Sequence, residues 1–149
     1  MDLFGSIKEN LVKLSDLGRI AENEWQRLEK RFQYIQLGAR IIMPNHVHGI
    51  ITINFNEANL LQKKNGVNRA GIEQFGSPVA GSIATIVRSY KSLVTQRYQW
   101  FTQSRFAKVW QRGFYDHVIR SEKDMENVEN YILNNPIKWS EDENFIIHP

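Results

Sequence analysis

Two histidines that alternate along a predicted strand are the first residues whose type and spacing could support chemistry. The sequence reads His46-Val47-His48 and continues into the apolar residues Ile51 and Ile53. Because side chains alternate between the faces of a strand, His46 and His48 should project together while Val47 enters the core. Two neutral imidazoles at this spacing can chelate a divalent ion, with a third ligand supplied from elsewhere. For such a pair alone, two polar residues on a solvated sheet face are the commoner case.

A tyrosine and an asparagine near the C-terminus form a second candidate group. Tyr131 and Asn135 lie four residues apart on a predicted helix, so they share one face of it. A phenol with a reference pKa near ~10 is a poor nucleophile unless a metal or a base assists it. The amide of Asn135 could reach the same metal as the histidines. The commoner role for such a tyrosine is half-buried packing.

Tyr115 and His117 are the third candidates. They lie two residues apart and would share a face if their segment is a strand. His117 would then be a contact to a metal ligand or to a phosphate, and a packed, hydrogen-bonded histidine is the alternative. The sequence contains no phosphate-binding loop, dinucleotide fingerprint, zinc-protease helix or serine-hydrolase elbow, which excludes the usual forms of those functions.

The charge distribution indicates a nucleic-acid surface in one part of the chain. Residues 77–120 contain seven basic residues and one acidic residue, a net charge of +6, whereas residues 121–149 contain two basic and seven acidic residues, a net charge of −5. Aromatic residues alternate with the basic ones, as a single-strand groove requires. A solvated helix face beside an ordinary aromatic core explains the composition equally well. The basic side chains predicted to contact nucleic acid are Arg88, Lys91, Arg97, Arg105, Lys108 and Arg112.

The bulk composition is that of one globular domain. The chain has 149 residues and no cysteine, which excludes disulfides and thiolate metal sites. It shows no stretch as apolar as a membrane span and no apolar leader, so we expect a cytoplasmic protein with no membrane partner.

Periodicity and capping signals predict an α+β fold with an antiparallel sheet and helices packed on one face. The turn at Pro44-Asn45 should join two strands into a hairpin. The predicted elements are a helix over 15–30, strands over 34–43 and 46–53, a long loop over 54–80, a helix over 82–98, strand and loop over 106–120, and a helix over 121–135.

Four sequence blocks together resemble the REP-associated tyrosine transposases, a group of single-tyrosine transposases with a histidine–hydrophobe–histidine signature (HUH transposases, with an IS200-like domain). The first is Met43-Pro44-Asn45-His46-Val47-His48-Gly49-Ile50. The others, in the family's order, are Leu17-Gly18-Arg19-Ile20 with Glu24-Trp25, the Trp110-Gln111-Arg112 to Arg120 segment, and Tyr131-Ile132-Leu133-Asn134-Asn135-Pro136. The resemblance extends from residue 3 to about residue 140.

This resemblance implies a ferredoxin-like (RRM-like) sandwich that binds single-stranded DNA bearing hairpins or palindromic repeats. It implies a Mg²⁺ or Mn²⁺ site on His46 and His48, with Asn135 as third ligand. Tyr131 would be the nucleophile that forms a 5′-phosphotyrosine link, and Tyr115 is the competing one. The expected protein is a nucleoid-associated transposase or endonuclease, as a monomer or homodimer.

The chain departs from the family pattern at its start, because the family's first strand has no counterpart ahead of Leu3. We therefore expect a single transposase-like domain, shortened at its N-terminus, whose sheet lacks that strand. Loss of a strand would expose backbone groups on its neighbours. Two alternatives follow: an inactive, domesticated or truncated module that only binds DNA hairpins, and a metal-dependent phosphodiesterase that uses water.

Overall fold

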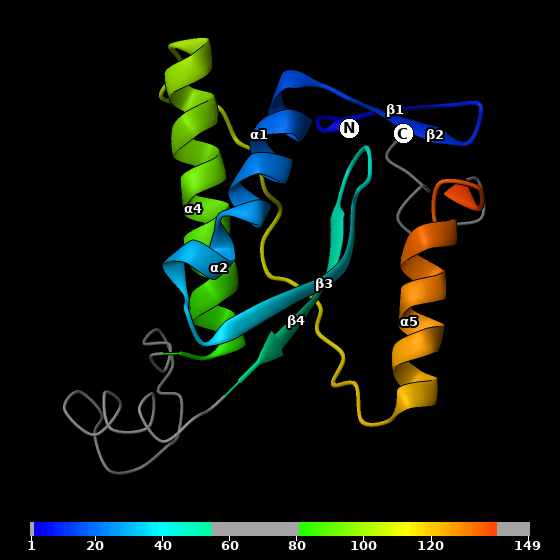
Figure 1. The fold of residues 1–149 in the computed structure, drawn as a ribbon. Helices are drawn as coiled ribbons and strands as arrows, with labels where there is room; N and C mark the ends of the chain where they lie inside the picture. Colours follow the sequence, from blue (N-terminus) through cyan, green and yellow to red (C-terminus); the bar gives the residue numbers. More distant parts are fainter. Residues whose placement is uncertain (1, 55–80, 140–149) are drawn as a thin grey trace, which may run out of the picture.

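The computed structural model describes residues 2–54 and 81–139 and shows a small α+β fold (Figure 1). Its described parts contain two separate antiparallel hairpins and four helices, an arrangement compatible with the predicted ferredoxin-like class. The elements are β1 (Gly5–Lys8), β2 (Leu11–Leu14), α1 (Asp16–Gln26), α2 (Leu28–Arg31), β3 (Ile35–Ile42), β4 (Val47–Ile53), α4 (Ile83–Thr102) and α5 (Glu122–Asn134).

The main core lies where α1 and α4 pack against each other and against one face of the β3–β4 hairpin. Helices α1 and α4 begin where the sequence predicts a helix start, because each follows a serine that caps it. The Ser15 hydroxyl accepts a hydrogen bond from the Gly18 amide, and the Ser82 hydroxyl accepts one from Thr85. The buried residues of α4, Ile86, Tyr90 and Val94, recur at helical spacing and form one apolar face.

The β3–β4 hairpin presents its two faces to different helices. Val47 and Ile51 pack against the α1–α4 core, and a Cβ on Gly49 would lie 2.2 Å from the Trp25 ring of α1. A side chain larger than hydrogen at position 49 would therefore push the hairpin away from α1. By strand alternation, His48 and Ile50 point to the opposite face.

Helix α5 lies on that opposite side of the hairpin, where it contacts β3 (Figure 1). Ser121 caps its N-terminus by accepting from the Asp124 amide, as predicted. Its Ile132 is 2% exposed, and Ile50 of β4 is 6% exposed, although neither belongs to the α1–α4 core. The hairpin is thus enclosed from both sides, with α5 covering the face that carries His48.

The β1–β2 hairpin was not predicted from the sequence. Its turn residues Glu9 and Asn10 have positive φ values of 52° and 62°, the geometry of a tight two-residue hairpin turn. The hairpin is attached to the rest of the fold near its base: Phe4 donates its backbone N–H to the Pro44 carbonyl at 2.8 Å. The segment before β1 therefore supports the turn that leads into His46.

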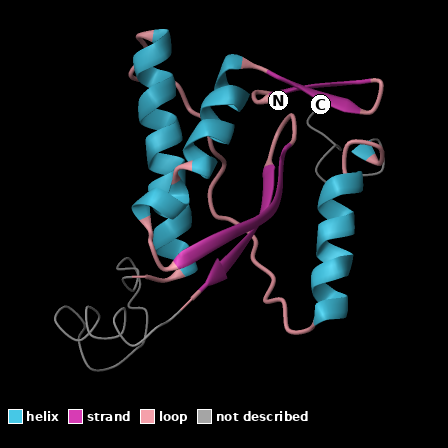
Figure 2. Ribbon diagram, viewed as in Figure 1, coloured by secondary structure: helices cyan, strands magenta, loops and turns pink. Residues whose placement is uncertain are grey.

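Three predicted elements differ from the structure or lie outside it. The helix over 15–30 is divided into α1 and α2 at Arg27, whose ψ of −8° departs from helical geometry. The strand predicted within 106–120 is wrong: the segment forms no ladder in the described structure and is drawn as a loop (Figure 2). A strand forms only where a neighbouring strand supplies backbone hydrogen bonds, and in the described structure this segment pairs with no strand. Residues 55–80 of the predicted long loop lie outside the described residues.

Not one of the four described helices has the length and apolar character that crossing a membrane requires.

Candidate active site

The two histidines of the β3–β4 hairpin converge through their imidazole nitrogens. The Nε2 atoms of His46 and His48 lie 2.8 Å apart, and the ring centroids are 4.4 Å apart at an interplanar angle of 78°. Both side chains are partly buried. The predicted projection of the pair from one face is therefore confirmed, and the two Nε2 atoms share a hydrogen bond.

Asn45 orients the first of these rings. Its side-chain oxygen lies 2.6 Å from Nδ1 of His46, so Nδ1 carries a proton and donates it to Asn45. With the proton on Nδ1, the Nε2 atom of His46 carries a lone pair that faces His48. Asn45 was not among the predicted site residues, although its place directly before the first histidine was a signal that could have indicated this role.

Two aromatic rings from the α5 region flank the histidine pair. The Tyr131 ring packs edge-on against the His48 ring, with centroids 5.3 Å apart at 77°. The Trp139 ring lies nearly parallel to the His46 ring, with centroids 6.0 Å apart at 26°. Tyr131 is 51% exposed, so part of its side chain reaches the surface. The sequence predicted the approach of Tyr131 but did not single out Trp139.

Asn135 lies one turn beyond Tyr131 and is almost completely buried. Its residue is 3% exposed, and its Oδ1 atom has no hydrogen-bond partner within the described structure. A buried amide oxygen without a partner costs free energy, about 1–3 kcal/mol, which a ligand at this position would recover. Asn135 also stands midway in sequence between Tyr131 and Trp139, the two residues whose rings flank the histidines.

The residues present form a donor set that could hold a divalent ion. Two ligand atoms that each lie about 2.1 Å from an ion, with a right angle between the two bonds, are about 3 Å apart. This is close to the distance between the Nε2 atoms of His46 and His48. The unpartnered oxygen of Asn135 is a suitable third ligand by type. Among the described residues there is no cluster of three or more His, Asp or Glu side chains, so an amide or water would have to complete the coordination.

Tyr115 and His117 lie elsewhere, at the beginning of α5. His117 Nε2 is 3.0 Å from a carboxylate oxygen of Asp124, in the first turn of that helix. Tyr131 follows Asp124 by seven residues, which is about 10 Å along a helix axis. Tyr115 is 94% exposed. The structure therefore groups Tyr131 with the histidines and gives His117 a carboxylate partner instead.

The six basic residues predicted to contact nucleic acid fall into two groups. Lys91 donates to the carbonyls of Gln111 and Gly113, at 3.0 and 2.8 Å, and burial lowers the pKa of its ammonium group. Arg97 forms an ion pair with the buried Glu24. These two side chains therefore hold parts of the fold together. The other four residues, Arg88, Arg105, Lys108 and Arg112, are exposed.

The aromatic residues of the same segment also divide. Tyr90 is buried, donates its hydroxyl to the Ala21 carbonyl, and has a pKa raised far above its usual value, chiefly by burial, so it is no nucleophile. Trp110 packs on Phe4 and Tyr90 in the core. Trp100 and Phe106 are instead 85% and 93% exposed. Only part of the aromatic content predicted for a groove is thus available to a partner.

The fold and site define an α+β protein whose histidine pair and helix-borne tyrosine come together on one face of a hairpin. In sequence, the chain is 34% identical to an uncharacterized protein of Haemophilus influenzae over 145 residues, which is 97% of this chain and 78% of that protein. The chain therefore belongs to the same family as this uncharacterized protein.

A more distant relative carries a functional name. The chain is 26% identical over 101 residues to a Haemophilus influenzae protein named "Putative REP-associated tyrosine transposase", a match that covers 65% of this chain and 47% of that protein. The chain is thus similar, over part of its length, to a protein that carries this name. No family model matches the chain, and no solved structure matches it significantly.

Proposed function

We propose that this protein nicks and rejoins single-stranded DNA at hairpin or repeat sequences, with Tyr131 as the nucleophile and a divalent ion on His46, His48 and Asn135. The observation that carries the proposal is the contact between the Tyr131 and His48 rings, which brings a half-exposed phenol beside a pair of convergent imidazoles. The likeness to a protein named as a tyrosine transposase supports the same chemistry.

In the proposed reaction, Tyr131 Oη attacks the phosphorus of a phosphodiester. An Oη–P bond forms, the bond from phosphorus to the 3′ oxygen breaks, and the DNA is left with a 5′-phosphotyrosine on one side and a free 3′-OH on the other. The phenolic proton goes to solvent, and the leaving oxygen takes a proton from solvent. A 3′-OH that later attacks the phosphotyrosine restores a phosphodiester without an external energy source, because the link retains the energy of the broken bond.

When bound, the ion would polarise the scissile phosphate and stabilise the leaving oxygen. Two imidazoles favour Mn²⁺ over Mg²⁺, since Mg²⁺ prefers an all-oxygen shell. The roles of the protein groups follow from their positions. Asn45 holds His46 in the tautomer that presents Nε2, and Trp139 limits the space on the other side of the His46 ring.

The proposal is tested with hairpin DNA labelled at its 3′ end, because the 5′-phosphotyrosine link leaves the protein on the 3′ fragment. We expect a labelled protein–DNA adduct on a denaturing gel when Mn²⁺ is present, and none when the ion is removed with EDTA. Addition of an oligonucleotide with a free 3′-OH should release the adduct as joined DNA. Failure to form any adduct across a panel of hairpin substrates with Mn²⁺ would contradict the proposal.

Replacing Asn45 with alanine is expected to weaken Mn²⁺ binding by about 10- to 100-fold, the usual effect of removing a group that orients a metal-bound histidine. Without its acceptor, the Nδ1 proton of His46 is no longer fixed, so Nε2 presents its lone pair for only part of the time. Asn45→Asp retains the acceptor and should retain the affinity. The measurement is a calorimetric Mn²⁺ titration of each purified protein.

The matched control for this titration is Asn23→Ala, which removes the same amide from an exposed position of α1. It should bind Mn²⁺ like the unmodified protein. Equal affinities of the Asn45→Ala and Asn23→Ala variants would show that the contact to Nδ1 does not position the histidine.

A further inference from the structure

The C-terminal end of α4 carries large apolar side chains that the core does not use. Trp100 is 85% exposed and Phe101 is 54% exposed, and both lie off the buried stripe of the helix. Phe106, just after the helix, is 93% exposed. Exposed indole and phenyl rings this near one another in sequence are unusual on a protein surface without a ligand. They therefore require an explanation other than packing.

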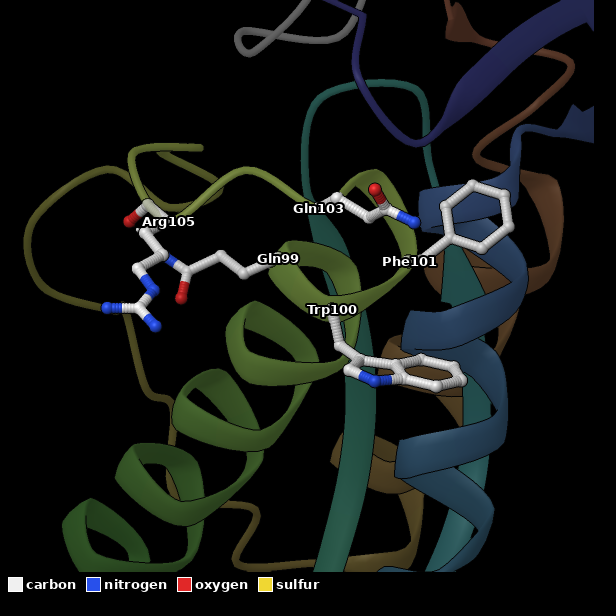
Figure 3. Close-up of a pocket in the computed structure, with 5 residues that line it drawn as sticks. All are labelled: Gln99, Trp100, Phe101, Gln103 and Arg105. Atoms are coloured by element: carbon white, nitrogen blue, oxygen red, sulfur yellow. Dashed lines mark hydrogen bonds between the residues drawn. The ribbon is translucent and has the colours of Figure 1, made fainter.

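Two of these rings belong to a pocket of about 570 Å³ that also contains polar groups. Its lining residues are Gln99, Trp100, Phe101, Gln103 and Arg105 (Figure 3). The rings of Trp100 and Phe101 lie on one side of the end of α4, and Gln99 and Arg105 lie on the other, with Gln103 between them (Figure 3). A ligand here would meet flat apolar rings, a guanidinium group and amide groups.

The segment that supplies most of the pocket's lining carries charge of one sign. Between Arg97 and Arg112 the sequence contains four basic residues and no acidic residue. All four are exposed, and Arg97 among them is paired with Glu24. A two-fold contact with a second copy would bring this patch against itself, so positive charge would face positive charge. A ligand that is both flat and anionic fits the patch better.

From these contacts we infer that the pocket at the end of α4 is a stacking site for unpaired bases of single-stranded DNA, separate from the histidine–tyrosine group. The rings of Trp100, Phe101 and Phe106 stack on bases, and Arg105 holds an adjacent phosphate. The identity of the ligand rests on the proposed function. In the view of Figure 1, the C-terminal end of α4, the β3–β4 turn and the C-terminal end of α5 all lie toward the top, so a strand held here can continue toward Tyr131.

The test is binding of a fluorescent oligothymidylate, which has no hairpin, measured in EDTA so that no cleavage occurs. We expect Trp100→Ala to raise the Kd by about 5- to 100-fold at fixed salt, the range for loss of one base–aromatic contact. Phe106→Ala should act in the same direction. Arg105→Gln should reduce the slope of log K against log salt by about 0.7, because one phosphate contact is lost.

The matched control is Leu11→Ala, which removes an exposed apolar side chain (72%) from the first residue of β2 and should leave the Kd unchanged. Thermal melting of each variant checks that the fold is retained, as expected for exposed positions. Unchanged oligothymidylate binding in Trp100→Ala and Phe106→Ala would overturn the inference. The inference would also be overturned if these variants lost binding to anionic phospholipid vesicles while their DNA binding stayed intact.

The outcome is separable from that of the proposed function. Binding that depends on Trp100, in a protein that forms no adduct with hairpin DNA, would support the stacking site and contradict the nicking reaction. Adduct formation in a protein whose DNA binding does not depend on Trp100 would support the nicking reaction and contradict the stacking site.

Discussion

Phenylalanine in place of Tyr131 is expected to abolish the covalent protein–DNA adduct and to leave the fold and the Mn²⁺ affinity unchanged. The substitution removes only the hydroxyl oxygen, so the ring can keep its contact with His48. Because Tyr131 is 51% exposed, little stability depends on it. Loss of a catalytic nucleophile lowers the rate by more than about 10³-fold. The measurement is the rate of adduct formation with the 3′-labelled hairpin in Mn²⁺.

The matched control is Tyr115→Phe, which removes the hydroxyl of the competing nucleophile. Tyr115 precedes α5, and the structure gives it 94% exposure and no role near the histidine pair. The Tyr115→Phe variant should form the adduct at the normal rate. An adduct that survives in Tyr131→Phe and disappears in Tyr115→Phe would contradict the assignment.

Two further outcomes of the same experiment correspond to the other functions that the sequence left open. DNA that is cut without any adduct, and equally well by Tyr131→Phe, would indicate a phosphodiesterase that uses water. Hairpin DNA that is bound but never cut would indicate a binding module. The unpartnered Oδ1 of Asn135 favours the enzyme, because a buried polar atom without a partner is a cost that DNA binding alone does not explain.

The parts of the fold that could be predicted are those specified by nearby residues. Ser15, Ser82 and Ser121 each cap the helix that the sequence predicted after them. The β3–β4 hairpin follows from two apolar runs joined at Pro44-Asn45. The β1–β2 hairpin was missed although Ile7 and Val12 are paired in it, because a four-residue strand gives a weak periodic signal.

The strand predicted within 106–120 shows the limit of local reasoning. Its alternating aromatic and apolar residues suit a strand, but a strand exists only when a neighbouring edge supplies hydrogen bonds. The structure gives the segment another support: Lys91 of α4 binds the carbonyls of Gln111 and Gly113. No local pattern indicates that a lysine twenty residues earlier will hold a loop.

The candidate site was likewise predictable only where nearby residues specify the geometry. Strand alternation brought His46 and His48 together, and helix spacing placed Tyr131 and Asn135 on one face. The contact of Tyr131 with the histidine pair is a matter of tertiary packing, and it was expected only because of the family resemblance. The packing of Trp139 against His46 depends on the turn after α5 and had no local signal.

Glutamine in place of Glu24 is expected to lower the free energy of unfolding by about 2–4 kcal/mol. The carboxylate of Glu24 is completely buried and is bonded by Arg27 at 3.0 Å, by Arg31 at 2.9 Å and by Arg97 of α4. Glutamine keeps the volume, but its amide nitrogen would face a guanidinium group, donor against donor. Breaking a buried ion pair usually costs 3–5 kcal/mol, and the partial exposure of the arginines lowers this to about 2–4.

The measurement is thermal unfolding, with an expected fall in Tm of about 5–15 °C for a chain of this size. Asp16→Asn is the matched control, because it neutralises one carboxylate of α1 in an ion pair whose members, Asp16 and Arg19, are both more than half exposed. That pair should contribute less than about 1 kcal/mol. Similar Tm values for the two variants would show that the Glu24 cluster does not hold α1 to α4.

The Glu24 variant also separates stability from chemistry. Glu24 belongs to the α1–α4 core side of the hairpin, whereas His46, His48 and Tyr131 gather on the other side. Below its lowered Tm, the Glu24→Gln protein should therefore form the adduct at the normal rate per folded molecule, and the activity should fall only as the folded fraction falls. A loss of rate in fully folded protein would mean that packing of α1 on α4 sets the geometry of the histidine pair.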